Sequence, residues 1–140
     1  MRTVAAEIAE EAASRSGQYQ KHGAVVVQNG KVVSSGFNKS TGRYPSMHTL
    51  HAEMAAIKMC ASPVDSHVYV VRVNSQGELA NSKPCKRCYR FMLKHGISKV
   101  WWSTGDGNSF DSAELIRNHE HLYQRGNEGP HRGSSPESER

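Results

Sequence analysis

Two short segments of this sequence carry side chains that could bind a metal ion and move protons: HAE at 51–53 and PCKRC at 84–88. A catalytic zinc ion takes three protein ligands from His, Cys or carboxylate side chains and keeps a fourth position for water. Cys85 and Cys88 are three positions apart, so both sulfur atoms would lie on one face of a first helical turn. We therefore predict that His51, Cys85 and Cys88 bind Zn²⁺.

A carboxylate beside these residues would supply the proton chemistry. Glu53 lies two positions beyond His51, so it need not point at the metal and can act on a water molecule that the zinc activates. It would take a proton from that water and deliver it to a ring nitrogen and then to departing ammonia. The pattern H-x-E followed by P-C-x-x-C is typical of zinc deaminases. Half of a structural zinc site and a redox dithiol are alternatives, but the chain has no second Cys pair for the former.

Both segments are expected to begin a helix. Residues 51–61 are strong helix formers with no breaker before Pro63. Pro84 suits the entrance to a second helix over 85–95, which Gly96 would end. The amino end of this helix favours the thiolate form of cysteine, which binds metals. The apolar strand 67–73 lies between the two helices in sequence, so a crossover connection would place them side by side on one face of a sheet.

The remaining elements complete a mixed sheet of about five strands. Asn29-Gly30 joins two β-branched runs, 24–28 and 31–38, and predicts a hairpin. A further strand is expected at 100–102, and the turn at 105–108 predicts a short antiparallel return over 109–111. We expect Ser112 to cap a short helix that runs to Ile116. Residues 74–83 read as a loop.

The first helix is expected over residues 3–16, before the hairpin. Its apolar stripe would consist of Val4, Ile8 and Ala12, and Gly17 would end it. In the next helix of the chain, Met54, Ile57 and Met59 are expected in the core, and so is Trp102 of the strand near the end.

Composition limits the class of protein. With 140 residues the chain fits one domain, for which we expect residues 1–125, followed by a disordered polar tail at 126–140. No apolar run approaches the ~20 residues of a membrane helix, and no secretory signal is visible. Three cysteines are too few for a disulfide framework, so we expect an intracellular protein without membrane contact, in the cytoplasm or alternatively in the nucleus. The net charge of +5 favours phosphate-bearing partners, although a solvated basic face explains it equally well.

The two motifs and the order of elements resemble the cytidine and deoxycytidylate deaminase superfamily over residues 4–115. The resemblance implies a three-layer α/β/α fold, with helices on both faces of the sheet. It further implies that Asn38 contacts the sugar of the substrate, that Ala52 touches the base, and that Pro84 flanks the pocket. His48, three positions before His51, is a further candidate that lines the pocket or orients a phosphate. Members are commonly dimers or tetramers, so a homo-oligomer is expected.

The substrate class is less constrained by the resemblance. Free cytidine deaminases usually have Cys at the position of His51, whereas deoxycytidylate, tRNA adenosine and polynucleotide cytidine enzymes have His. The antiparallel return after 105–108 is instead similar to the free-nucleoside group. The leading expectation is conversion of cytosine to uracil in a nucleoside or nucleotide. The alternatives are editing of cytosine or adenine in single-stranded DNA or RNA, and a catalytically silent zinc-containing binding module.

Overall fold

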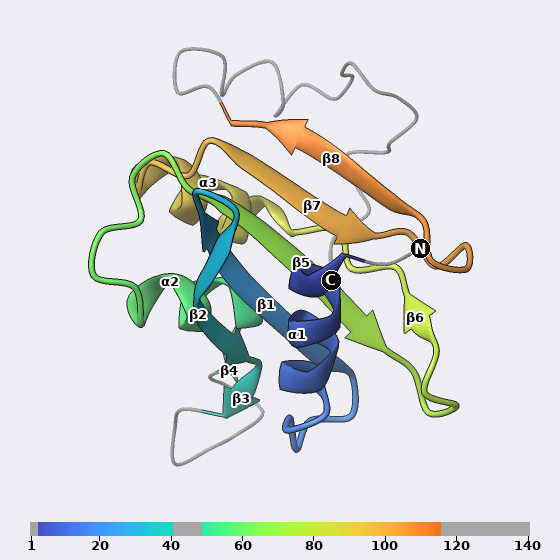
Figure 1. Ribbon diagram of the computed structural model, residues 1–140. Coiled ribbons are helices and arrows are strands. Elements are labelled where there is room, and N and C mark those ends of the chain that lie inside the picture. Colours follow the sequence, from blue (N-terminus) through green and yellow to red (C-terminus); the bar gives the residue numbers. More distant parts are fainter. Residues whose placement is uncertain (1–2, 41–48, 116–140) are drawn as a thin grey trace.

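The structure is a computed structural model that describes residues 3–40 and 49–115. Its elements in chain order are α1 (Val4–Ala13), β1 (Lys21–Gln28), β2 (Lys31–Phe37), β3 (Lys39–Ser40), β4 (Thr49–Leu50), α2 (Ala52–Lys58), β5 (His67–Val73), β6 (Leu79–Ala80), α3 (Lys86–Lys94), β7 (Lys99–Ser103) and β8 (Phe110–Glu114) (Figure 1).

The main sheet has the strand order β2-β1-β5-β7-β8, with β6 paired beside the end of β5. β1 and β2 form the predicted hairpin, whose turn places Asn29 and Gly30 at φ 51° and 77°, the left-handed region that such turns require. β5 is antiparallel to β1 and parallel to β7, and β8 returns antiparallel to β7. The predicted mixed sheet and the antiparallel return are therefore confirmed.

Helices cover both faces of this sheet, as predicted (Figure 1). α1 lies on one face, where Thr3 caps its first turn by accepting a hydrogen bond from the Ala6 amide at 3.1 Å. The expected apolar stripe of α1 is wrong at Val4, which is 68% exposed, whereas its other two members are buried or packed against the core. Buried alanines, among them Ala9, complete the face toward the sheet. At Gly23 of β1 a side chain would overlap the carbonyl oxygen of Ala9, so only small residues fit this contact.

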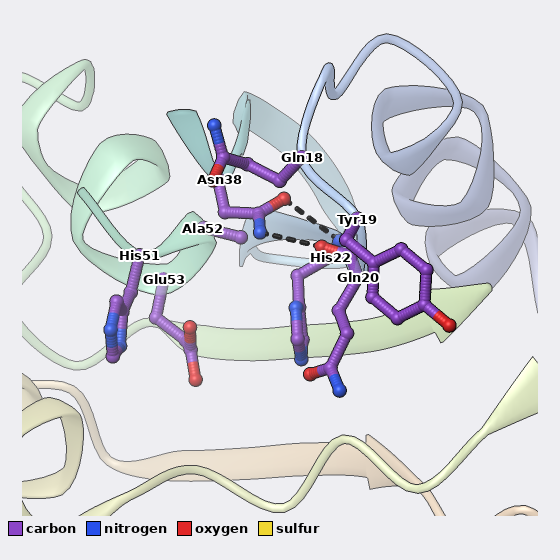
Figure 2. Close-up of a pocket in the computed structure, with 8 residues that line it drawn as sticks. All are labelled: Gln18, Tyr19, Gln20, His22, Asn38, His51, Ala52 and Glu53. Carbon is purple, nitrogen blue, oxygen red and sulfur yellow. Dashed lines mark hydrogen bonds between the residues drawn. The ribbon is translucent and has the colours of Figure 1, made fainter. Parts of the chain in front are cut away.

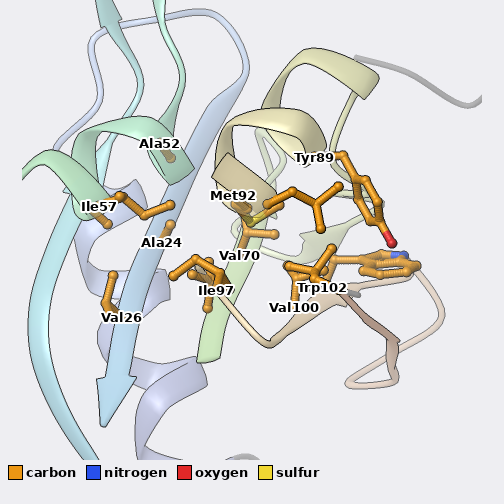
Figure 3. Packing of buried hydrophobic residues seen from close by; sticks show 14 residues of the cluster. Ala24, Val26, Ala52, Ile57, Val70, Tyr89, Met92, Ile97, Val100 and Trp102 are labelled. Carbon is orange, nitrogen blue, oxygen red and sulfur yellow. The ribbon is translucent and has the colours of Figure 1, made fainter. Parts of the chain in front are cut away.

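The other face of the sheet carries α2, α3 and the larger apolar core (Figure 3). Ile57, Met92 and Val100 are 0–1% exposed there, and Trp102 is buried at 5% as predicted. α2 ends at Lys58 rather than at Ala61. Because the helix stops there, Met59 is 74% exposed and not in the core, contrary to the sequence-based expectation.

Two short segments differ from the sequence-based prediction. Ser112 does not cap a helix, because it lies in β8 opposite Trp101 of β7. β6 lies within the predicted loop 74–83 and pairs with the end of β5. Both segments lack the apolar alternation that marks a longer strand, and the sheet edge supplies their backbone partners. The predicted polar tail 126–140 and the domain boundary near 125 lie outside the described residues. None of the described helices has the length and apolar character needed to cross a bilayer.

Candidate active site

The three predicted metal ligands meet where two helices begin. His51 and Cys85 are the residues that precede the first turns of α2 and α3, and both have extended backbones. Cys88 lies in the first turn of α3. The sheet holds α2 and α3 side by side on one face, so these helix beginnings approach each other. Among the described residues, one possible ligand atom from each of His51, Cys85 and Cys88 lies within 4.8 Å of the others.

The distances between these atoms suit a tetrahedral zinc ion. The Nδ1 atom of His51 is 3.0 Å from Sγ of Cys88 and 3.8 Å from Sγ of Cys85. Bond lengths of about 2.0–2.1 Å to nitrogen and 2.3 Å to sulfur place tetrahedral N and S ligands about 3.6 Å apart. The observed separations lie on both sides of this value. One nitrogen and two sulfur donors also form the type of ligand set that zinc prefers, so the residues fit the ion.

The protonation of Cys85 favours metal binding as well. A hydrogen bond with the Cys88 side chain, assisted by His51, lowers the pKa of Cys85 from 9.0 to about 3, although burial acts in the opposite direction. The thiolate is the form of cysteine that binds metals. Cys85 is therefore ready to bind an ion without first losing a proton at neutral pH.

Glu53 lies beside this ligand group in the first turn of α2 and is fully buried. A helix amino terminus favours a carboxylate at this position. Glu53 lines the same cavity as His51 and Ala52, and its carboxylate points into that cavity (Figure 2). The structure thus places a carboxylate next to the ligand group without making it part of that group, as the sequence predicts.

A cavity of about 250 Å³ opens in front of Glu53 and His51. Sequence reasoning missed one wall of it, which comes from the segment before β1 and the start of that strand: Gln18, Tyr19, Gln20 and His22. The available signal was a polar run immediately before a strand whose hairpin partner is followed by Asn38. Such a run lies at the end of the sheet where β1 starts, and α2 begins at the same end.

Asn38 ties this wall to the end of β2. Its Oδ1 accepts a hydrogen bond from the His22 amide at 2.9 Å, and its Nδ2 donates to the Gln20 carbonyl at 2.7 Å. The Asn38 amide donates to the His22 carbonyl at 3.2 Å, and the Asn38 carbonyl accepts from Ser16 Oγ at 2.9 Å. Asn38 is 8% exposed and lines the cavity. Both polar ends of its side chain therefore hold protein backbone.

The other predicted substrate-binding residues take different positions. Ala52 lines the cavity although it is fully buried. Pro84 is also fully buried, but it is not among the described residues that line the cavity. His48 lies outside the described residues. Contacts of these residues with a substrate stay predictions.

Buried hydroxyl groups position the segment that leads into Cys85. Ser82 Oγ donates to the Val70 carbonyl of β5 and accepts from the Ser103 amide of β7, both at 2.9 Å. The Ser82 amide also donates to the Ser103 carbonyl at 2.9 Å. These bonds fix the chain to the central strands just before Pro84, and they set where α3 begins.

Comparison with known proteins agrees with this geometry. The family model described as the cytidine and deoxycytidylate deaminase zinc-binding region matches residues 2–104. No curated protein matches the chain. A zinc-binding family and a His-Cys-Cys group of suitable geometry confirm the prediction of zinc as the cofactor.

Solved structures with the same fold include deaminases from several organisms. A cytidine deaminase from Burkholderia pseudomallei has a TM-score of 0.62 at 21% identity, covering 86% of this chain and 97% of that chain. The dCMP deaminase of cyanophage S-TIM5 has a TM-score of 0.53 at 21% identity, covering 76% and 87%. A cytidine deaminase from Mycobacterium leprae has a TM-score of 0.53 at 23% identity, with the same coverage. At such identities the likeness concerns the fold.

Proposed function

The chain belongs to the family of the cytidine and deoxycytidylate deaminase zinc-binding region, and from this premise we propose that it hydrolyses cytosine to uracil in a nucleoside or nucleotide. The single observation that carries the proposal is the position of Glu53. This buried carboxylate lines one cavity together with His51 but does not belong to the His-Cys-Cys group. A purely structural zinc site has no need of a carboxylate there.

The reaction replaces the exocyclic amino group of cytosine by oxygen. A carbon–oxygen bond to water forms, the carbon–nitrogen bond breaks, and ammonia leaves. His51, Cys85 and Cys88 would hold the zinc ion, which when bound supplies Lewis-acid chemistry that makes water nucleophilic near neutral pH. Glu53 takes one proton from the water and donates it to the ring nitrogen. It then takes the second proton from the hydroxyl group added to the ring carbon and donates it to the amino group, which leaves as ammonia.

The surroundings of Glu53 suit this role. Full burial keeps bulk water from competing for its protons. The cavity volume of about 250 Å³ lies near the lower end of the range of about 300–1,000 Å³ for ligand pockets. This size supports a small substrate such as a nucleoside or nucleotide.

The test is ammonia release from cytidine, deoxycytidine, their monophosphates and single-stranded oligonucleotides. Glu53→Gln is expected to retain stoichiometric zinc and to lose at least about 100-fold in turnover, the scale of general acid–base catalysis. Glu78→Gln, which changes an exposed carboxylate, serves as the matched control and is expected to behave as wild type. Normal turnover by Glu53→Gln would contradict the role of Glu53. Failure of the wild type on the whole panel would favour a catalytically silent binding module.

Single-stranded nucleic acid is a second candidate substrate, supported by the charge of α3. Lys86, Arg87, Arg90 and Lys94 are exposed on this helix, which carries no acidic residue. Tyr19 at the cavity is 99% exposed and could stack on a neighbouring base. For this candidate, oligonucleotide turnover should fall steeply with salt, and replacing Lys94 by Gln should reduce the salt slope. Lys31→Gln in β2 is the matched control, because Lys31 is exposed on a different element.

We also propose that the chain forms a homo-oligomer, as members of its family commonly do. Light scattering coupled to size-exclusion chromatography measures the molar mass directly. A dimer or tetramer is the expected result. A mass of 15.5 kDa would correspond to the monomer and contradict this proposal.

A further inference from the structure

We infer that His22 is a substrate-contacting residue that helps to determine specificity, and that Asn38 acts as its positioning residue. The inference rests on the proposed function and adds a contact that the sequence motifs do not indicate. The ligand is an uncharged oxygen of the substrate, either the ring carbonyl of the base or a sugar hydroxyl.

The position of the His22 side chain is the first observation. His22 is 6% exposed, yet it lines the same cavity as Glu53 and His51. Figure 2 shows its imidazole extending into the cavity in the same direction as the Glu53 carboxylate, on the side toward Gln20. The reacting carbon of a substrate must lie at the Glu53 end. His22 would then lie along the remainder of the base or its sugar.

The use of the Asn38 side chain is the second observation. The carboxamide of Asn38 makes hydrogen bonds to the backbone of Gln20 and of His22. These bonds hold the main chain at the start of β1, which fixes the direction in which the His22 ring leaves the backbone. Gly23 follows at once and packs against α1 without room for a side chain. The backbone on both sides of the ring is therefore held in place.

The polar groups of the wall indicate which atoms of the substrate it contacts. Its polar side chains are the amides of Gln18 and Gln20, the hydroxyl of Tyr19 and the imidazole of His22. Among the described residues, no Lys or Arg lines this cavity. Amides and imidazole donate to carbonyls and exchange hydrogen bonds with hydroxyl groups. This wall is thus suited to neutral oxygen atoms more than to a phosphate.

Binding measurements test the inference separately from catalysis. Calorimetric titrations with cytidine and with free cytosine would use the Glu53→Gln protein, in which turnover is blocked, and variants made in that background. His22→Phe keeps an aromatic ring without hydrogen-bonding groups and leaves both Asn38 bonds intact, because those bonds involve backbone atoms of Gln20 and His22. Losing one hydrogen bond should weaken cytidine binding about tenfold. His22→Gln retains a donor and an acceptor and should recover most of this loss.

A matched control and two ligands make the result interpretable. His95, at the far end of α3 from the ligand group, provides the control variant His95→Phe, which should bind as the parent does. If His22 contacts the sugar, its replacement weakens binding of cytidine but not of cytosine. If it contacts the ring carbonyl, both ligands lose affinity. Unchanged affinity of His22→Phe for both ligands, with zinc retained, would overturn the inference.

The positioning role of Asn38 is tested by a double-mutant cycle. If Asn38 acts through His22, the loss of affinity caused by Asn38→Ala should be much smaller in the His22→Phe background than in the parent. Additive losses, or a loss of affinity with Asn38→Ala but none with His22→Phe, would show that Asn38 contacts the ligand itself. Should Asn38→Ala not fold, Asn38→Asp, which keeps the acceptor for the His22 amide, replaces it in the cycle.

The two proposals fail in different ways. Wild-type protein that binds cytidine through His22 but releases no ammonia would refute the deaminase function and leave the binding role of His22 standing. Active protein whose cytidine affinity does not respond to His22 replacement would refute the inference alone.

Discussion

A substitution at Gly36 of β2 should disturb the site without touching it, because α2 packs directly against Gly36. A methyl group added at Gly36 would lie 2.6 Å from the Ala56 amide nitrogen, 2.7 Å from Ala55 Cβ and 2.9 Å from the Ala55 carbonyl carbon. Two of these atoms belong to the backbone and cannot turn aside as a side chain would. Gly36→Ala therefore forces α2 away from the sheet.

The size of the effect follows from the geometry. Carbon atoms in contact prefer separations of about 3.5–4.0 Å, so α2 must move by roughly 1 Å. Overpacking of this kind costs about 1–3 kcal/mol in the free energy of unfolding. α2 carries Glu53, and His51 precedes it, whereas Cys88 lies in α3 and Cys85 immediately precedes that helix. A 1 Å shift between the two helices should lower turnover by about 100-fold and weaken zinc binding.

The assay compares thermal unfolding, zinc content and ammonia release for Gly36→Ala with those of wild type. Gly17→Ala is the matched control, because nothing lies within 4 Å of the added methyl group. Its stability should change by less than about 0.5 kcal/mol. Adding Ala55→Gly to Gly36→Ala removes one of the three close contacts and should recover part of the stability.

A stable Gly36→Ala protein with normal turnover would refute the reasoning. That result would mean that α2 does not pack this closely on β2, or that the position of the helix does not govern the site. Loss of turnover with full stability would also contradict the argument, because the same displacement should produce both effects.

Three further predictions concern single side chains. Cys88→Ala should reduce zinc content measured by mass spectrometry to well below one equivalent, while Cys60→Ala, outside the ligand group, should retain the metal. Ser82→Ala should lower the free energy of unfolding by about 1–3 kcal/mol in denaturant titrations, since it leaves the Ser103 amide without its buried partner. Ile57→Ala should cost about 2–5 kcal/mol in the same titrations, whereas Met59→Ala should be close to neutral because Met59 is 74% exposed.

Local sequence pattern predicted most of the elements, for identifiable physical reasons. Asn29 and Gly30 adopt positive φ angles at little cost, so the hairpin could be located from this pair alone. The stripe of α1 was predicted wrongly at Val4 alone, because valine is more apolar than the alanines that are buried beside the sheet. The close contact between α1 and Gly23 decided which face of the helix is buried. Gly23 belongs to another element, β1, so the helix sequence alone does not reveal this contact.

The sequence by itself predicted which residues would bind zinc and which carboxylate would move protons, because ligand type and helix spacing are local properties of the chain. Only the tertiary structure decided which residues form the cavity wall beside them. The wall made by Gln20 and His22 exists because Asn38, the residue after β2, hydrogen-bonds to the backbone before and within β1. Such contacts depend on strand pairing and on the fit between helix and sheet, which no local pattern specifies.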